Sequence, residues 1–172
     1  MTSEESIEEQ TSDLIDQVHH EHEHLRRLFD DLATRFADIA AGKTGADSQD
    51  DLVATASEDL EVALEDMLHH FNQEEEVFFV DMERRFPELQ SDIEALVQAH
   101  EEMTQRTRWL HKQLSKEPEE LTRELEVIVD VLRSLSELVD EHTKNETELF
   151  DTVLNKIPAD ERRELLETMR QI

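Results

Sequence analysis

The stretches HHFNQEEEVFFV (residues 69–80) and EHTKNETELF (residues 141–150) decide the fold expected for this chain. Each contains a histidine followed four residues later by a glutamate, His70 with Glu74 and His142 with Glu146. A step of four residues places both side chains on one face of an α-helix. In both stretches that face is the apolar one, so each pair is directed toward the protein interior. A buried carboxylate is costly unless it is paired or bound to a metal, and two such pairs indicate a buried metal centre.

Long helices are expected on both sides of these stretches, because the sequence has only two glycines, three prolines and no tyrosine. Apolar residues at helical spacing predict four long helices and a short one, over about residues 12–41, 49–86, 92–115, 118–155 and 159–170. Ser48 with Asp51, and Ser91 with Glu94, resemble capping boxes at the starts of the second and third helices. Residues 42–45, with a glycine at each end, should end the first helix, and Pro87 should end the second.

The connections between these helices are short, which favours antiparallel neighbours. We therefore predict an all-α protein, an antiparallel up-down-up-down four-helix bundle with a short C-terminal helix. A length of 172 residues fits one domain. We assign residues 1–11 to an acidic N-terminal segment, 12–155 to the bundle and 156–172 to the C-terminal helix.

Two further histidines belong with the two pairs. His22 shares its helix face with Val18, Leu25 and Phe29, and His100 lies in the apolar stripe of the third helix. Residues on antiparallel neighbours have equal height when they are equally far from the turn between them. By this rule one layer should hold six candidate metal ligands: His22, His70, Glu74, His100, His142 and Glu146.

The other five histidines are not expected to be ligands. The helical phase of His20 and His24 directs them away from the core, and His19 lies at the edge of the apolar stripe, so a solvated polar face is the simplest interpretation of all three. His69 is one step off the stripe and should be exposed or lie next to a ligand. His111 faces inward but lies about three turns from His100, which favours a hydrogen-bonded core histidine.

Six imidazole and carboxylate ligands are too many for one tetrahedral zinc ion, and this mixture suits iron or manganese. Two metal ions divide the set sensibly, with two histidines each, both glutamates bridging, and an oxo or hydroxo bridge. We therefore expect two iron ions, with manganese or zinc as possible substitutes.

Composition excludes several other classes of function. A net charge of −28 makes nucleic acid and an anionic membrane surface unlikely partners. The absence of cysteine excludes disulfides and thiolate metal sites. The acidic N-terminus does not resemble a signal peptide, and no apolar run is long enough to span a membrane. A cytoplasmic protein is the default expectation.

The order of one histidine, His-x-x-x-Glu, one histidine and His-x-x-x-Glu resembles the hemerythrin-like, or HHE cation-binding, domain family. The local sequences agree with this: HEHLRRLF (22–29) is similar to the family's first helix, HFNQEEEVFF (70–79) to its second, and AHEEM (99–103) and EHTKNE (141–146) to its third and fourth. The resemblance covers about residues 12–155. Val80 stands where the family frequently has proline.

Two departures bear on function. Oxygen-carrying hemerythrins usually have a fifth histidine where this chain has Thr104, and an aspartate where it has Thr147, with Glu146 offered instead. The loss of one imidazole argues against reversible oxygen transport. Members with this ligand pattern are associated with iron handling, nitric oxide or peroxide chemistry, and repair of iron centres. The resemblance thus implies a di-iron protein whose partner is a small inorganic ligand, O₂, NO or peroxide, in stress response or iron homeostasis.

Three functions remain open from the sequence. The first is a di-iron protein that binds or reacts with such a ligand, with a pocket walled by phenylalanines or with these side chains serving only as core: Phe29, Phe71, Phe78 and Phe150. The second is an iron sensor or storage module without turnover. The third is an acidic interaction protein with vestigial ligands.

Overall fold

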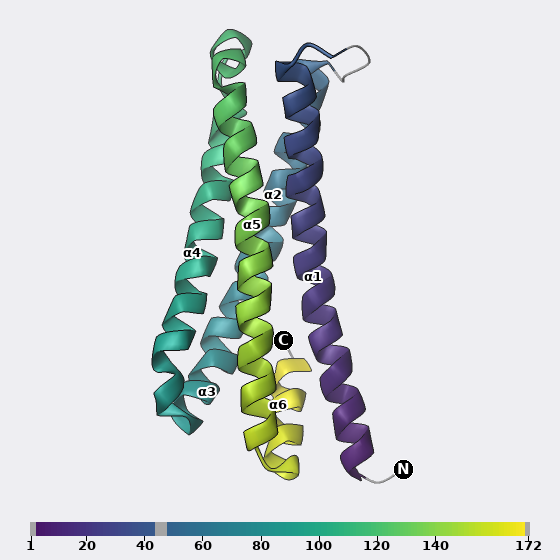
Figure 1. Cartoon of the computed structure of the whole chain (residues 1–172), viewed down its shortest axis with the longest axis vertical. Helices are drawn as coiled ribbons and strands as arrows, with labels where there is room; N and C mark the ends of the chain where they lie inside the picture. Colours follow the sequence, from purple (N-terminus) through teal and green to yellow (C-terminus); the bar gives the residue numbers. More distant parts are fainter. Residues whose placement is uncertain (1–2, 44–47, 171–172) are drawn as a thin grey trace.

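The computed structural model describes residues 3–43 and 48–170, and all of the regular secondary structure in these ranges is helical (Figure 1). The elements are α1 (Ser3–Ala40), α2 (Gln49–Gln73), a π-helical turn η1 (Glu74–Phe78), α3 (Phe79–Arg85), a 3₁₀ turn η2 (Pro87–Leu89), α4 (Gln90–Gln113), α5 (Pro118–Lys156) and α6 (Ala159–Arg170). The expectation of an all-α protein built as a helical bundle is confirmed. No helix in the described ranges is long and apolar enough to cross a membrane.

The helix ends agree with the sequence at three places and differ at the start of α1. Gly42 follows α1 with φ of +65°, a conformation that glycine adopts without strain. Ser48 caps α2, because its side chain accepts a hydrogen bond from the Asp51 amide. Pro118 occupies the first turn of α5. In contrast, α1 begins at Ser3 rather than near residue 12. Gly45, the other glycine expected to end α1, lies outside the described residues.

The capping box predicted at Ser91 is wrong. The N-cap of α4 is Leu89, with no side-chain cap, and Ser91 already lies inside the helix. The cause is the 3₁₀ turn over Pro87–Leu89, which passes directly into α4 and so starts the helix before Ser91. The third helix therefore begins and ends about two residues earlier than expected, at Gln90 and Gln113.

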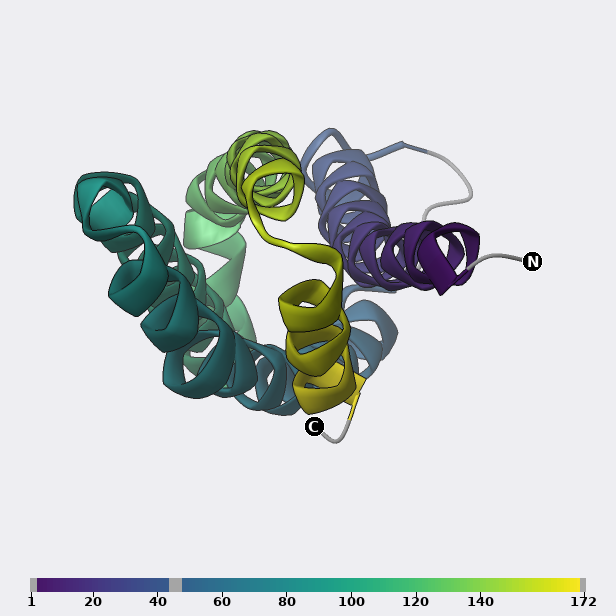
Figure 2. The same cartoon turned by 90° about the horizontal axis from the view of Figure 1, so that it is seen from below.

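The long helices pack in a closed ring. α1 contacts α5 and α2, and α4 contacts the same two helices. The short α6 lies at one end of this ring, against α1 and η1 (Figure 2). Leu165 of α6 is buried there, packed with residues of α3, α4 and α5. The C-terminal helix therefore covers the apolar core at that end.

The apolar core is split into two clusters by a polar layer. The larger cluster lies above the layer in Figure 1, and the smaller one lies below it, at the α6 end. On α5 the large cluster stops at Val139 and the small one starts at Leu149. On α4 the small cluster stops at Leu96 and the large one starts at Met103. Buried histidines and glutamates occupy this interruption.

Candidate metal centre

The six residues singled out from the sequence meet in the layer between the two clusters. Five of them are at most 5% exposed, and His70 is half-buried. Their ligand atoms form two groups, within each of which every atom lies within 4.8 Å of the others. One group holds His22 and His70 and the other His100 and His142, while Glu74 and Glu146 belong to both. This division matches the one expected for two metal ions, with two histidines each and both carboxylates shared.

The tautomer of His22 is fixed by a hydroxyl on α5. Thr143 Oγ1 donates its hydrogen to the Val139 carbonyl at 2.8 Å. A hydroxyl has one hydrogen, so at 2.9 Å from His22 Nδ1 it must accept the hydrogen of that nitrogen. The proton of neutral His22 is thereby held on Nδ1. Its Nε2, which is buried and has no hydrogen-bond partner, presents a lone pair to the layer.

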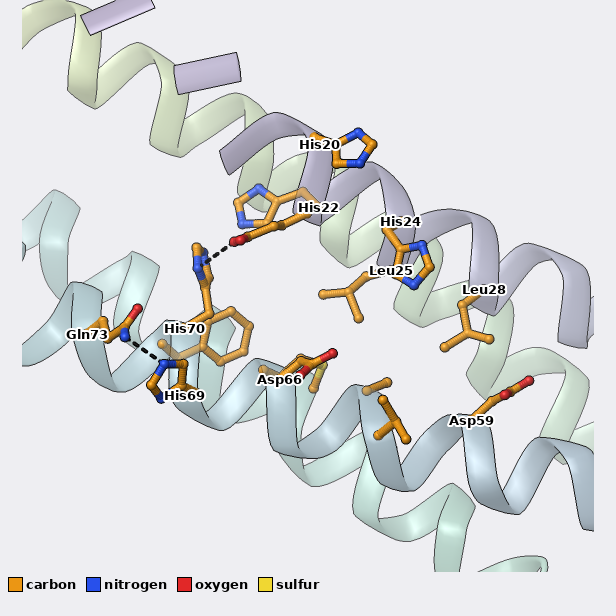
Figure 3. Close-up of a pocket in the computed structure, with 15 residues that line it drawn as sticks. His20, His22, His24, Leu25, Leu28, Asp59, Asp66, His69, His70 and Gln73 are labelled. Atoms are coloured by element: carbon orange, nitrogen blue, oxygen red, sulfur yellow. Dashed lines mark hydrogen bonds and ion pairs between the residues drawn. The ribbon is translucent and has the colours of Figure 1, made fainter. Parts of the chain in front are cut away.

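Carboxylates outside the layer hold two of the other rings. His70 Nδ1 lies 2.8 Å from Glu21 of α1, the contact drawn as a dashed line beside His70 in Figure 3. His100 Nδ1 lies 3.0 Å from Glu75. Both carboxylates accept the Nδ1 hydrogen, which turns Nε2 of each ring toward the shared glutamates. Metal-binding histidines typically have such an outer carboxylate or hydroxyl partner, which sets ring orientation and tautomer.

Several nitrogen and oxygen atoms approach one another closely within the layer. Nε2 of His142 lies 2.7 Å from Glu146 and 3.0 Å from Nε2 of His100. The carboxylate oxygens of Glu74 and Glu146 are buried, and three of the four have an imidazole Nε2 within 3.1 Å. Burying polar atoms in this way is expensive. The layer holds more lone pairs than donors, since His22 Nε2 and Glu146 Oε1 are buried without a hydrogen-bond partner. A cation satisfies such an arrangement, so the donor set fits a metal.

Burial and charge shift the pKa values of the layer in opposite directions. Desolvation lowers the pKa of His22 to about 4, and burial together with the neighbouring His142 lowers that of His100 to about 4. Burial also acts to lower the pKa of His70, but hydrogen bonds to Glu21 and Glu74 outweigh it and raise the pKa to about 10. Burial raises the pKa of Glu146, and the adjacent Glu74 acts in the same direction. In the metal-free protein at neutral pH, His70 thus carries a positive charge beside Glu21 and Glu74.

The π-helical turn η1 begins at Glu74. In a regular α-helix neighbouring residues point about 100° apart, whereas here Glu74 and Glu75 reach the two nitrogens of the same ring. Glu74 Oε2 lies 3.1 Å from His100 Nε2, and Glu75 Oε1 lies 3.0 Å from His100 Nδ1. A π-helical turn commonly occurs at a functional site. Both the π-helical turn and the contact of Glu75 with His100 differ from the plain helix expected from the sequence.

Two phenylalanines pack on the same imidazole. Phe71 stacks on His100 with ring centroids 3.9 Å apart and planes at 6°, and Phe79 lies nearly parallel to it at 5.8 Å. Phe78 and Phe150 pack against each other in the smaller cluster, and Phe29 lies in the larger one. Of the four phenylalanines expected near the site, Phe71 therefore forms a wall of it. Phe79 contributes as well and was not foreseen.

The remaining histidines lie outside the two ligand groups. His20 and His24 are exposed as expected, and His69 is exposed with its Nε2 2.7 Å from the Gln73 amide. His19 differs from the expectation of a solvated residue, since it is half-buried and its Nε2 lies 2.6 Å from Thr147 Oγ1. His111 is also only half-buried, 3.5 Å from Ser57, rather than a core residue.

The two positions that depart from oxygen carriers are occupied by hydroxyls engaged elsewhere. Thr104 Oγ1 donates to the His100 carbonyl at 2.8 Å. Thr147 Oγ1 donates to the Thr143 carbonyl at 2.8 Å and faces His19. Both threonine hydroxyls thus donate their hydrogen bonds to backbone carbonyls, and neither residue belongs to a ligand group.

Comparison with protein families agrees with this geometry. The profile of the Hemerythrin HHE cation binding domain matches residues 13–154, which include all six residues of the layer. Searches of curated proteins and of solved structures find no match.

Proposed function

Because the chain belongs to the hemerythrin HHE cation-binding family, we propose that it is a non-haem di-iron protein that binds or reacts with O₂, NO or peroxide. The observation that carries the proposal is the pair of four-residue groups joined by Glu74 and Glu146. Imidazole and carboxylate together suit iron, and manganese or zinc would be substitutes. A family context of stress response or iron homeostasis, in the cytoplasm, belongs to the same proposal.

Some residues of this centre would bind the metal ions, and others orient the binding residues. His22 and His70 would hold one ion and His100 and His142 the other, with the two glutamates between them. Thr143, Glu21 and Glu75 keep Nε2 of three rings directed inward. When bound, the iron ions would supply the redox and Lewis-acid chemistry toward the small ligand. The two apolar clusters on either side, which we propose to be the core of an up-down-up-down four-helix bundle over residues 12–155, exclude bulk water from the layer.

The proposal is tested on protein reconstituted with Fe²⁺ without oxygen. The visible and Mössbauer spectra are recorded before and after addition of O₂, NO or peroxide. We expect a change with at least one of these ligands, and the ligand that acts would identify the reaction class. Iron-loaded protein whose spectrum responds to none of them would contradict reactivity while leaving iron binding intact.

A second candidate is an iron sensor or store without turnover. It is favoured by the two buried carboxylates that lie side by side in the layer, because satisfying them with a cation should add stability to the fold. This reading expects iron to raise the melting temperature without ligand chemistry. Equal melting temperatures for the metal-free and iron-loaded forms would remove it.

A further inference from the structure

Of the six residues of the layer, His70 is the most exposed to solvent. The side chain of His70 is 19% exposed, whereas those of Glu74, His100, His142 and Glu146 are 6% exposed or less, and His22 is 2% exposed as a residue. His70 and His22 both line a cavity of about 640 Å³ between α1 and α2, which we call the α1–α2 groove (Figure 3). Its floor is apolar, with Leu25 and Met67 among the residues there.

Apart from His70, the charged side chains of the groove are carboxylates. Glu21, Asp59 and Asp66 line it, and no lysine or arginine does. Asp66 and Asp59 project from α2 toward α1 in Figure 3. Neither of these two aspartates forms an ion pair or hydrogen bond with another described residue. Glu21 pairs with His70 at the inner end, so the negative charge that no described neighbour neutralises is that of Asp59 and Asp66.

Histidine side chains line the α1–α2 groove from its exposed edge to the metal centre. His20 and His24 of α1 and His69 of α2 lie at the exposed edge, and His70 lies at the inner end (Figure 3). Beyond His70 is Nε2 of His22, which is buried and unpartnered. Carboxylates and imidazoles bind and exchange divalent iron readily, because they are hard and borderline ligands. Such a series offers a cation successive weak contacts between solvent and the buried groups.

A second cavity also touches His22, on the side of α5, but two of its three carboxylates are neutralised. Glu23 and Asp140 in that cavity both pair with Arg26, at 2.6 and 3.3 Å. The guanidinium of Arg26 lies beside these two carboxylates, whereas Asp59 and Asp66 of the α1–α2 groove have no such neighbour among the described residues.

We propose that the α1–α2 groove is the uptake path for the divalent cation, with Asp59 and Asp66 attracting the ion and Glu21, beside His70, receiving it at the inner end. The inference rests on the proposed function, since it assigns the route by which iron reaches the six-residue layer. Clefts lined by one sign of charge concentrate ions of the opposite sign and raise association rates. Asp59 and Asp66 act on the rate of uptake and do not hold the ion in its final place.

The test compares two doubly substituted chains with the same net charge. Asp59→Asn with Asp66→Asn removes the charges in the groove. Glu58→Gln with Glu65→Gln removes two exposed carboxylates from the neighbouring positions of α2, which do not line it. Metal-free proteins are mixed with Fe²⁺ under anaerobic conditions, and a strong chelator is added to samples taken at intervals. The iron that the chelator does not remove is the amount already taken up at that time. Equal melting temperatures of the metal-free chains establish that both variants are folded.

We expect uptake by the Asp59→Asn/Asp66→Asn chain to be slower, by roughly threefold to tenfold at low ionic strength, with the same final iron content. The Glu58→Gln/Glu65→Gln chain should match the parent, and the difference should shrink as salt is added. Equal rates in all three chains, or equal slowing in both variants, would overturn the uptake path. So would a lower final iron content in the aspartate variant, which would make these residues holders. Failure of the parent chain to protect any iron would instead overturn the proposed function itself.

Discussion

At the scale of single residues, the layer is built from three kinds of contact. Nε2 atoms and carboxylates converge inside it, hydroxyl and carboxylate partners hold the outer nitrogens, and phenylalanine rings pack on His100. The six inner residues could be found from sequence because helical spacing determines which face a side chain lies on. The outer partners could not, since Glu21 and Glu75 each stand beside an inner residue, where the helical phase predicts a different direction.

The first prediction concerns Glu75. We expect Glu75→Gln to weaken iron binding by about 10-fold to 100-fold, because the charged partner of His100 Nδ1 makes that ring a stronger ligand. Competition with a chelator of known affinity measures the change. The matched control is Glu76→Gln, an exposed neighbour in the same π-helical turn. Equal affinities for the two variants would show that Glu75 does not support the ligand.

The second prediction concerns pH. His70 has a pKa of about 10, so in the metal-free protein at neutral pH its ring is protonated. A metal that binds Nε2 of this ring must displace the proton there. The raised pKa of Glu146 also favours the protonated form of the metal-free protein. Iron binding should therefore release protons, and apparent affinity should fall by about tenfold per pH unit for each proton displaced as the pH is lowered. Calorimetry in buffers of different ionisation enthalpy counts the protons. A heat of binding that is independent of the buffer would contradict this charge assignment.

At the scale of elements, regular helices were predictable and their irregularities were not. α5 and α6 lie within a residue of their expected bounds, because Pro118 and Pro158 delimit them. The π-helical turn at Glu74–Phe78 has no comparable signal, since its residues favour an ordinary helix equally well. It forms where Glu74 and Glu75 both reach His100 and where Phe78 and Phe79 are both buried, contacts that only the assembled bundle supplies.

The third prediction uses the two serines that resembled capping residues. Ser48→Ala should lower the free energy of unfolding by about 1 kcal/mol, because the Asp51 amide loses its acceptor at the start of α2. For a chain of this size that corresponds to a melting temperature roughly 2–4 °C lower. Ser91→Ala should leave the melting temperature almost unchanged, since Leu89 is the N-cap of α4. A larger loss at Ser91 than at Ser48 would reverse the assignment of the two caps.

At the scale of the whole molecule, the polar layer sits in the middle of the core and divides it. Burial of unsatisfied carboxylates there opposes folding, while the two apolar clusters favour it. The metal-free protein is therefore strained at the place where a cation would stabilise it. The layer could be predicted from the sequence, because residues at matched heights on antiparallel helices should lie together. The position of α6 could not be predicted, because a short helix can pack against any of several faces of a bundle.

The fourth prediction concerns the buried carboxylate of Glu146, whose burial opposes folding of the metal-free protein. Glu146→Gln removes a buried charge while keeping the shape of the side chain, and Glu146 is 1% exposed. We expect the metal-free variant to melt at the same or a higher temperature than the parent, and the stabilisation by iron to be largely lost. Differential scanning calorimetry with and without Fe²⁺ gives both values. A variant that melts lower without metal and keeps the full gain with iron would show that Glu146 serves packing rather than the ion.

The central claim is that Glu74 and Glu146 join two metal sites, and the metal content of the reconstituted protein tests it most directly. Iron per chain is measured after anaerobic loading and removal of loosely bound ions, for the parent chain and for a chain with His100→Ala and His142→Ala. We predict about two iron ions for the parent, matching the two ligand groups, and a loss of the ion held by the substituted pair. One ion in the parent, or none, would contradict the account.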